Sequence, residues 1–347
     1  MSYYLLPGIQ RGTIHENFLL EYVDGDGADI EPVINNSLQQ YLSSVKLEIS
    51  NCAVDWDSNK KYTNPYEYIH TVVPGSRVAI CKYKPLSRSY FKMVEMLKSL
   101  YILDGMAEHP IRTFHLAEGP GGFVEAVCNS RDNPDDVYHG MTLISDRDYV
   151  PGWKKGQEYL SAHPQIRLVY GKDNTGDILK PDNFDYCYEN YRNSMDLVTG
   201  DGGFDFSVNF NDQEKSASRL IFAQIAHAMI LQRHGGTFII KFFDIFTSAS
   251  IDFTYLLSCL YKKVYVIKPN TSRYANSERY LVCKSFQLED STCLYSAFRD
   301  MLVSLDANPS KSILRILDCD ISYFYLTRLE EYNAIIGQQQ KIGRAHV

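Results

Sequence analysis

The chain has 347 residues, with 35 lysines and arginines against 42 aspartates and glutamates, so its net charge is −7. That length allows one large domain or two smaller ones, and a hydrophobic content of 45% excludes wholesale disorder. An acidic chain is also a poor first candidate for a nucleic-acid binder, although the motifs described below weigh against that objection.

The cysteines argue against a metal or redox site. The nearest two of the eight, Cys283 and Cys293, are ten residues apart, so no C-x-x-C pair is present. We therefore expect no metal, and free thiols in a reducing intracellular compartment, the cytoplasm or the nucleus. The N-terminus shows no signal-peptide pattern and no stretch is apolar enough to cross a bilayer, so we expect no membrane segment.

Residues 1–75 are interpreted as an N-terminal extension that packs on or flanks the core. They are rich in Asn, Asp and Tyr, and helical periodicity is present at Leu38, Tyr41, Leu42, Val45 and Ile49. We expect one amphipathic helix there and loops elsewhere.

Residues 76–290 alternate between short apolar runs and longer amphipathic runs. The expected strands are 111–117, 141–145, 166–170, 196–199, 237–243, 264–267 and 280–283, and the clearest helices are 89–103, 123–130 and 213–234. This alternation predicts a mostly parallel α/β sheet covered on both faces. Pro269 ends one run and the next follows closely, which favours an antiparallel hairpin at the end. Residues 291–337 are expected to be a helical extension, and residues 338–347 a disordered tail.

A glycine-rich turn, FHLAEGPGGF at residues 114–123, follows one strand and opens a helix. Its glycines let the backbone approach a ligand closely, and the helix N-terminus offers free N–H groups. Doubly wound folds bind nucleotide-like ligands at this position. A tight turn without a ligand is the alternative, and the spacing does not fit the dinucleotide pattern G-x-G-x-x-G.

Charged residues mark four further places. Asp201 directly follows a strand, Lys241 lies in a strand that should be central, and Glu278 lies near the start of the last strand, after a basic turn-rich loop. Lys92 lies near the start of a helix. Charges in such places usually have partners or face a ligand crevice. Taken singly, a turn-forming Asp-Gly and a lysine that reaches solvent from a strand end are the alternatives.

The order Lys92, glycine-rich turn, Asp201, Lys241 and Glu278 resembles the FtsJ-type (RrmJ-like) ribose 2′-O-methyltransferases. The resemblance is greatest to the branch that methylates the first nucleotides of capped mRNA, including members from large DNA viruses. It covers roughly residues 60–285, through the stretches Asn64-Pro-Tyr-Glu-Tyr, 114–123, His139-Gly-Met-Thr, Gly176-Asp177-Ile178, 196–206, 235–244 and 268–283.

This resemblance implies a Rossmann-like methyltransferase fold, a seven-stranded, mostly parallel sheet whose last strand is antiparallel. It implies S-adenosylmethionine as cofactor, S-adenosylhomocysteine as product, and no metal. The catalytic tetrad would be Lys92, Asp201, Lys241 and Glu278. The cofactor-binding residues would be Glu118, Gly119, Pro120, Gly121, Gly122, Phe123, Asp146, Asp177 and Asp201.

Several roles follow from the resemblance. Asp177 would read the adenine amino group, and either Asp146 or Asp148 would bind the ribose. Many family members have Asp where this chain has His115, so Glu118 would supply the carboxylate instead. Our hypothesis is that Lys241 acts as base or orients the hydroxyl and Lys92 helps hold the 2′-oxygen, while the two acids position the lysines.

The implied partner is RNA, most of all the 5′ end of capped mRNA, with the capping or transcription machinery as a further partner. A viral member would work in a viral factory or virion. The expected RNA-binding residues are Arg77, Lys82, Lys84, Arg88, Arg273 and Ser277, and an ordinary solvated surface is the alternative for the basic ones. The competing functions are methylation of rRNA or tRNA ribose and a non-catalytic RNA-binding subunit.

Overall fold

The computed structural model describes residues 2–9, 17–25, 30–51, 64–145, 150–203 and 213–345. Its strands are β1 (Ser2–Leu5), β2 (Phe18–Val23), β3 (Arg112–Leu116), β4 (Val137–Met141), β5 (Ile166–Leu168), β6 (Met195–Gly200), β7 (Gln232–Phe242), β8 (Tyr261–Lys268), β9 (Arg279–Phe286) and β10 (Ser312–Leu317). Its α-helices are α1 (Asn36–Asn51), α3 (Ser89–Ser99), α4 (Gly122–Arg131), α5 (Gln157–Ala162), α6 (Pro181–Tyr191), α7 (Gln213–Ser216), α8 (Ser218–Leu231), α9 (Ser248–Leu260), α10 (Thr292–Ala307) and α11 (Tyr323–Ala345). Short 3-10 helices are η2 (Pro65–Ile69), η3 (Asp104–Met106) and η4 (Lys154–Gly156).

The main sheet has the strand order β1-β8-β9-β7-β6-β3-β4-β5. Strands β7, β6, β3, β4 and β5 are parallel neighbours, whereas β9 runs antiparallel between β7 and β8. The strands that follow β3 in the chain, β4 and β5, lie on one side of it in the sheet, and the later strands β6 and β7 lie on the other side. The strand order therefore reverses between β3 and β6. Ligands bind in such folds at the carboxyl ends of the strands beside this reversal.

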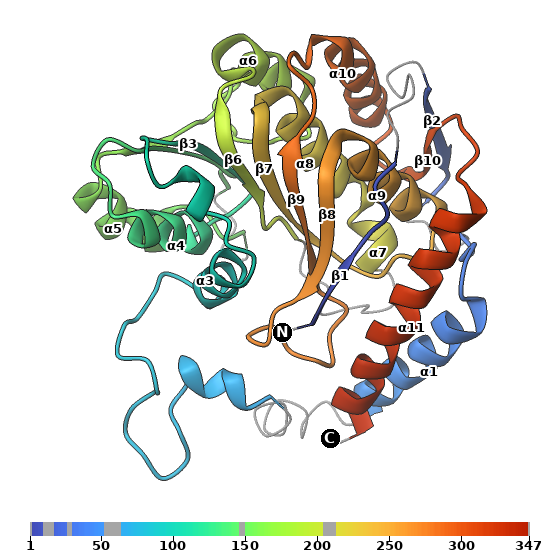
Figure 1. Cartoon of the computed structure of the whole chain (residues 1–347), viewed down its shortest axis with the longest axis horizontal. Coiled ribbons are helices and arrows are strands. Elements are labelled where there is room, and N and C mark those ends of the chain that lie inside the picture. Colours follow the sequence, from blue (N-terminus) through green and yellow to red (C-terminus); the bar gives the residue numbers. More distant parts are fainter. Residues whose placement is uncertain are drawn as a thin grey trace.

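Helices cover both faces of the sheet (Figure 1). One face packs on α3, α4 and α5 around a core that includes Met93 and Phe123. The other packs on α6, α8, α9 and α10 around a core that includes Phe222 and Phe253. The strands between these layers are buried and largely apolar, although they also carry buried polar side chains such as His115 and Thr199.

The predicted fold class is confirmed, and its antiparallel last strand is β9. One expected strand was misplaced: residues 141–145 were expected, but β4 is Val137–Met141. His139 and Gly140 interrupt the apolar run, yet both are buried. A Cβ on Gly140 would lie 2.8 Å from Trp153 Cη2, so glycine makes room there for an aromatic ring.

The N-terminal extension contains the expected helix as α1, but its other described residues are not all loops. β1 pairs antiparallel with β8 and adds an eighth strand to the sheet. β2 pairs antiparallel with β10 in a second, two-stranded sheet. Sequence periodicity misses both because each is short and its partner lies more than 250 residues away.

The C-terminal segment also departs from the expectation. It is not purely helical, because β10 separates α10 from α11. The tail that we expected to be disordered is helical as far as Ala345, as the end of α11. Gln340 is only 1% exposed and donates a hydrogen bond to Asp244 at 3.2 Å, so this polar segment is anchored in the core. Helix α1 packs along α11, as Figure 1 shows.

No helix in the described part of the chain is both long and apolar enough to span a membrane.

Candidate active site

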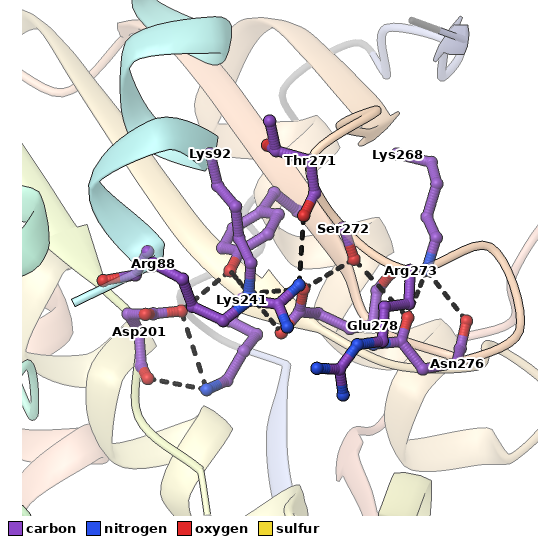
Figure 2. Close-up of polar contacts among 12 residues, drawn as sticks. Arg88, Lys92, Asp201, Lys241, Lys268, Thr271, Ser272, Arg273, Asn276 and Glu278 are labelled. Carbon is purple, nitrogen blue, oxygen red and sulfur yellow. Dashed lines mark hydrogen bonds and ion pairs between the residues drawn. The ribbon is translucent and has the colours of Figure 1, made fainter. Parts of the chain in front are cut away.

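The topology brings the four predicted catalytic residues together. Asp201 directly follows β6, and Gly200 of β6 pairs in register with Ile240 of β7. Lys241 of β7 pairs in turn with Tyr280 of β9, two residues after Glu278. Lys92 reaches the same place from α3, which lies on one face of the sheet (Figure 2).

The four side chains form two ion pairs. Lys92 Nζ lies 2.7 Å from Glu278 Oε1, and Lys241 Nζ lies 3.6 Å from Asp201 Oδ1. Lys241 Nζ also donates to the backbone carbonyl of Asp201 at 2.7 Å. A Cβ on Gly203 would come within 2.7 Å of Lys241 Nζ, so glycine at that position leaves room for the ammonium group.

Tyr280 joins the two pairs and was not among the predicted site residues. Its hydroxyl donates to Asp201 Oδ1 at 2.9 Å and accepts from Lys92 Nζ at 3.5 Å. Burial, followed by the charges of Asp201 and Glu278, raises the pKa of Tyr280 well above its ordinary value, so the hydroxyl keeps its proton. Side chains two apart on a strand share a face, and that spacing from Glu278 was the available signal.

Glu278 is held as a carboxylate. Burial alone would raise its pKa, but the charges of Lys92, Lys241 and Lys268 outweigh that effect and hold the pKa well below its ordinary value. Ser272 Oγ donates to Glu278 Oε1 at 2.7 Å. The buried Lys268 Nζ donates to the Glu278 carbonyl and to the Asn276 carbonyl, which fixes the loop between β8 and β9 from inside.

The tetrad borders a hollow of about 360 Å³ that is also lined by Ser87, Arg88, Gly119, Pro120 and Gln213. A second hollow of about 350 Å³ is lined mainly by apolar groups, and Asp177 also lines it. Ala117, Pro151 and Gly203 line both, so the two adjoin. Burial raises the pKa of Asp177, and its Oδ1 accepts from the Leu179 amide at 2.9 Å.

The glycine-rich turn forms one wall between β3 and α4. A Cβ on Gly119 would lie 1.7 Å from the Pro151 carbonyl oxygen, and Gly121 has a φ of +110°, so both positions require glycine. Other predicted members of this turn do not border either hollow. Gly122 packs against Ser87 and Ser89, and Phe123 is fully buried against Tyr280.

Glu118 is not among the residues that line either hollow, and its expected role in cofactor binding stays a prediction. Its carboxylate is buried and contacts His115 Nδ1 at 3.2 Å and the Thr199 hydroxyl. Burial raises the pKa of Glu118, and the neighbouring His115 only partly opposes that effect. Glu118 therefore supports the turn from within the core. Asp146 and Asp148, the two candidates for binding ribose, lie outside the described residues.

The expected RNA-binding residues fall into three groups. Arg77, Lys82 and Lys84 are exposed on the segment before α3. Arg88 and Arg273 are partly exposed and share one carboxylate partner, Glu67, which was not among the predicted site residues. Ser277 is only 1% exposed and donates to Gln213 Oε1 at 2.5 Å, so it orients a residue of the cleft and does not itself face it.

The described residues contain no group of three or more His, Cys, Asp or Glu side chains that could hold a metal ion.

Comparisons with known proteins identify the family. The model of FtsJ-like methyltransferases matches residues 85–286, more than half of the chain. A human cap-specific mRNA (nucleoside-2′-O-)-methyltransferase 1 is 33% identical over 238 residues, 65% of this chain and 28% of the relative. A Leishmania braziliensis protein of that name is 37% identical over 217 residues, 58% of this chain and 53% of the relative.

A third relative, the cap-specific mRNA (nucleoside-2′-O-)-methyltransferase 2 of Drosophila melanogaster, is 25% identical over 261 residues, 72% of this chain and 36% of the relative. The chain thus spans between 28% and 53% of the length of these curated relatives. They come from two animals and a protozoan, so the expected viral link has no support from them. The protein belongs to the FtsJ-like methyltransferases.

Proposed function

We propose that the protein transfers a methyl group from S-adenosylmethionine to a ribose 2′-OH at the 5′ end of capped mRNA. One observation carries the proposal: the Lys92–Glu278 and Lys241–Asp201 pairs border a polar hollow that adjoins a second, largely apolar one. A nucleotide substrate and a nucleoside cofactor could meet there with the reacting atoms beside the lysines.

The second hollow fits an adenosyl group. Leu143, Ile178 and Leu179 offer apolar contact, and Asp177 offers an acceptor for an exocyclic amino group. Gly119 would let the backbone approach the methionine part, beside the start of α4. When bound, S-adenosylmethionine would supply an electrophilic methyl group on a sulfonium.

The lysines would act on the ribose hydroxyl. Asp201 holds Lys241 Nζ through its carbonyl, so that the charged ammonium is oriented to bind the 2′-oxygen. In its neutral form the amine would instead accept the hydroxyl proton at Nζ. Lys92 Nζ would hold the 2′-oxygen by hydrogen bonding, and the ionised Glu278 keeps that ammonium in place. Tyr280 would keep the two lysines at a fixed separation.

The printed names of the relatives support capped mRNA as the substrate. Labelled methyl transfer to matched capped and uncapped transcripts tests both parts of this proposal. We expect label in RNA and a strong preference for the capped transcript. Equal labelling of the two would reject cap dependence, and no label in either would reject RNA methylation.

A further inference from the structure

Glu67 of η2 binds two arginines from different parts of the chain. Its side chain is only 2% exposed, and its Oε1 lies 2.8 Å from Arg88 Nη2 and 3.1 Å from Arg273 Nε. Its Oε2 accepts from Arg88 Nη1 at 3.4 Å and from Arg273 Nη2 at 3.2 Å. His70 is a weaker third neighbour, with Nε2 at 4.0 Å. One buried carboxylate thus fixes two guanidinium groups side by side.

Both arginines flank the catalytic tetrad. Arg88 lines the polar hollow and lies four residues before Lys92 in the sequence. Arg273 lies in the loop between β8 and β9, next to Ser272, whose hydroxyl binds Glu278. Arg88 Nη2 also donates to the Thr271 carbonyl at 3.1 Å, and Glu95 Oε2 accepts from the Thr271 amide at 3.1 Å (Figure 2 shows the two arginines and Thr271). The two arginines are therefore held by Glu67 and, through Arg88, by the carbonyl of Thr271.

The cluster carries a net positive charge, because one carboxylate faces two guanidinium groups. Burial would raise the pKa of Glu67, but hydrogen bonding from Arg273 and the charge of Arg88 outweigh it and hold the pKa below its ordinary value. Glu67 uses Nε and Nη2 of Arg273, and Nη1 has no hydrogen-bond partner among the described residues. Guanidinium forks suit phosphate oxygens, which accept several N–H bonds at once.

We propose that Glu67 is a brace that presets Arg88 and Arg273 as a clamp for one phosphate group of the RNA beside the catalytic lysines. This inference rests on the proposed RNA substrate. The carboxylate fixes rotamer-rich side chains before binding, so less entropy is lost when the phosphate arrives. Glu67 is thus a positioning residue that acts through the two arginines.

Two simpler roles for Glu67 make different predictions. If its charge merely repelled RNA, neutralising it would strengthen binding, because the net charge near the cleft would become more positive. If it merely anchored the segment 64–86, any other anchor of that segment would matter equally. Glu125 is such an anchor: it is also 2% exposed and accepts from the Tyr83 hydroxyl and the Leu86 amide, with no arginine among these contacts.

The test compares Glu67→Gln with Glu125→Gln in the full chain saturated with S-adenosylhomocysteine. Binding of a fluorescent capped RNA decamer is measured over a range of salt concentrations. We expect Glu67→Gln to weaken RNA binding about tenfold, and Glu125→Gln to leave it within about twofold of the wild type. In a chain that already carries Arg88→Ala and Arg273→Ala, Glu67→Gln should have no further effect.

Tighter binding by Glu67→Gln, equal losses in the two glutamine variants, or a matching loss of cofactor affinity would each overturn the brace. A 5′-hydroxyl decamer separates two phosphate sources: an equal loss on both RNAs assigns a backbone phosphodiester, and a loss on capped RNA alone assigns the cap triphosphate. Both results support the clamp. If the wild-type protein binds RNA without methylating it, the proposed function is wrong and the brace is not affected. If Glu67→Gln binds RNA as the wild type does, the brace is wrong and the proposed function is not affected.

Discussion

Two clusters of charged side chains lie on opposite faces of the sheet, where β7 ends and β9 begins. The first, which we call the open cluster, consists of Lys92, Asp201, Lys241, Glu278 and Tyr280. Its four charged residues line a hollow of about 360 Å³, and Tyr280 bonds to Lys92 and Asp201. In the second, the closed cluster, Asp244 is bound by Lys46 at 3.0 Å, by Arg279 at 2.5 Å and by Gln340 at 3.2 Å. The adjacent cavity there is only about 20 Å³.

Two adjacent residues of β9 belong to different clusters: Tyr280 to the open one and Arg279 to the closed one. Lys241 pairs with Tyr280, and the next pair along, Phe242 with Arg279, points to the opposite face. The closed cluster is covered by α1 and α11, which contribute Lys46 and Gln340, whereas the open cluster has no such cover in the described structure. Similar charges therefore serve two purposes, and access decides which: the covered ones dock helices, and the accessible ones are available to a substrate.

The largest effect that we expect comes from Lys241→Ala in the open cluster. Loss of the amine should lower methyl transfer about 10³-fold, the range typical for a positioned acid or base. The rate is measured at saturating cofactor and RNA. The melting temperature and the affinity for S-adenosylhomocysteine should stay near those of the wild type, and an active Lys241→Ala variant would remove this residue from the chemistry.

In the closed cluster, Asp244→Asn should destabilise the fold by about 3–5 kcal/mol, because it leaves Lys46 and Arg279 buried without a counter-charge. Urea unfolding measures this effect, and Lys241→Met serves as the control on the other face. If Lys241→Met lowered the stability as much as Asp244→Asn, the contrast between the two clusters would be wrong.

The pH dependence gives a separate test of the closed cluster. Burial raises the pKa of Asp244, but Lys46 and Arg279 outweigh it and lower the pKa to about 2. Because the folded pKa lies below the unfolded value, the carboxylate contributes stability that is present above about pH 4. That contribution should be lost as the pH falls toward 2, and unfolding of Asp244→Asn should lack this part of the acid dependence.

Asp177→Ala should weaken S-adenosylhomocysteine binding about tenfold, the cost of one hydrogen bond from a half-buried acceptor. Calorimetric titration measures it. Asp173→Ala is a nearby control, since that carboxylate bonds to Thr175 and Asn183 and is not among the lining residues of the second hollow. Similar losses in both variants would point to a damaged loop instead of a lost contact.

The smallest effect is expected from Tyr280→Phe, which removes only the hydroxyl between the two ion pairs. We predict a decrease in kcat of severalfold to about tenfold, because one hydrogen bond contributes about 1 kcal/mol. KM for cofactor should not change. A loss as large as that of Lys241→Ala would mean that Tyr280 takes part in proton transfer and does not only position the lysines.

The strand–helix alternation predicted the fold. The tetrad was proposed from the family resemblance, and the structure brings its Asp201 and Lys241 together at neighbouring strand ends. Position along the chain does not reveal where a side chain points. For example, the sequence did not show that the Glu118 carboxylate contacts His115 and Thr199 in the core. Glu67 was missed because its arginine Arg273 is 206 residues away.

The structures of the N-terminal and C-terminal extensions could not be predicted from local sequence patterns either. β1 has four residues and forms only against β8, and the polar end of α11 is helical where it docks on α1 and on Asp244. Such segments take their structure from tertiary contacts, which periodicity does not record.

The most direct test of the account locates the methyl group on the product. Wild-type protein and Lys241→Ala are incubated with capped RNA and labelled S-adenosylmethionine, and the RNA is digested to nucleotides and analysed by mass spectrometry. We predict label on the ribose 2′-oxygen of the first transcribed nucleotides with the wild type and almost none with the variant. Label on a base, or equal labelling by the two proteins, would contradict the central claim that the open cluster carries out ribose methylation.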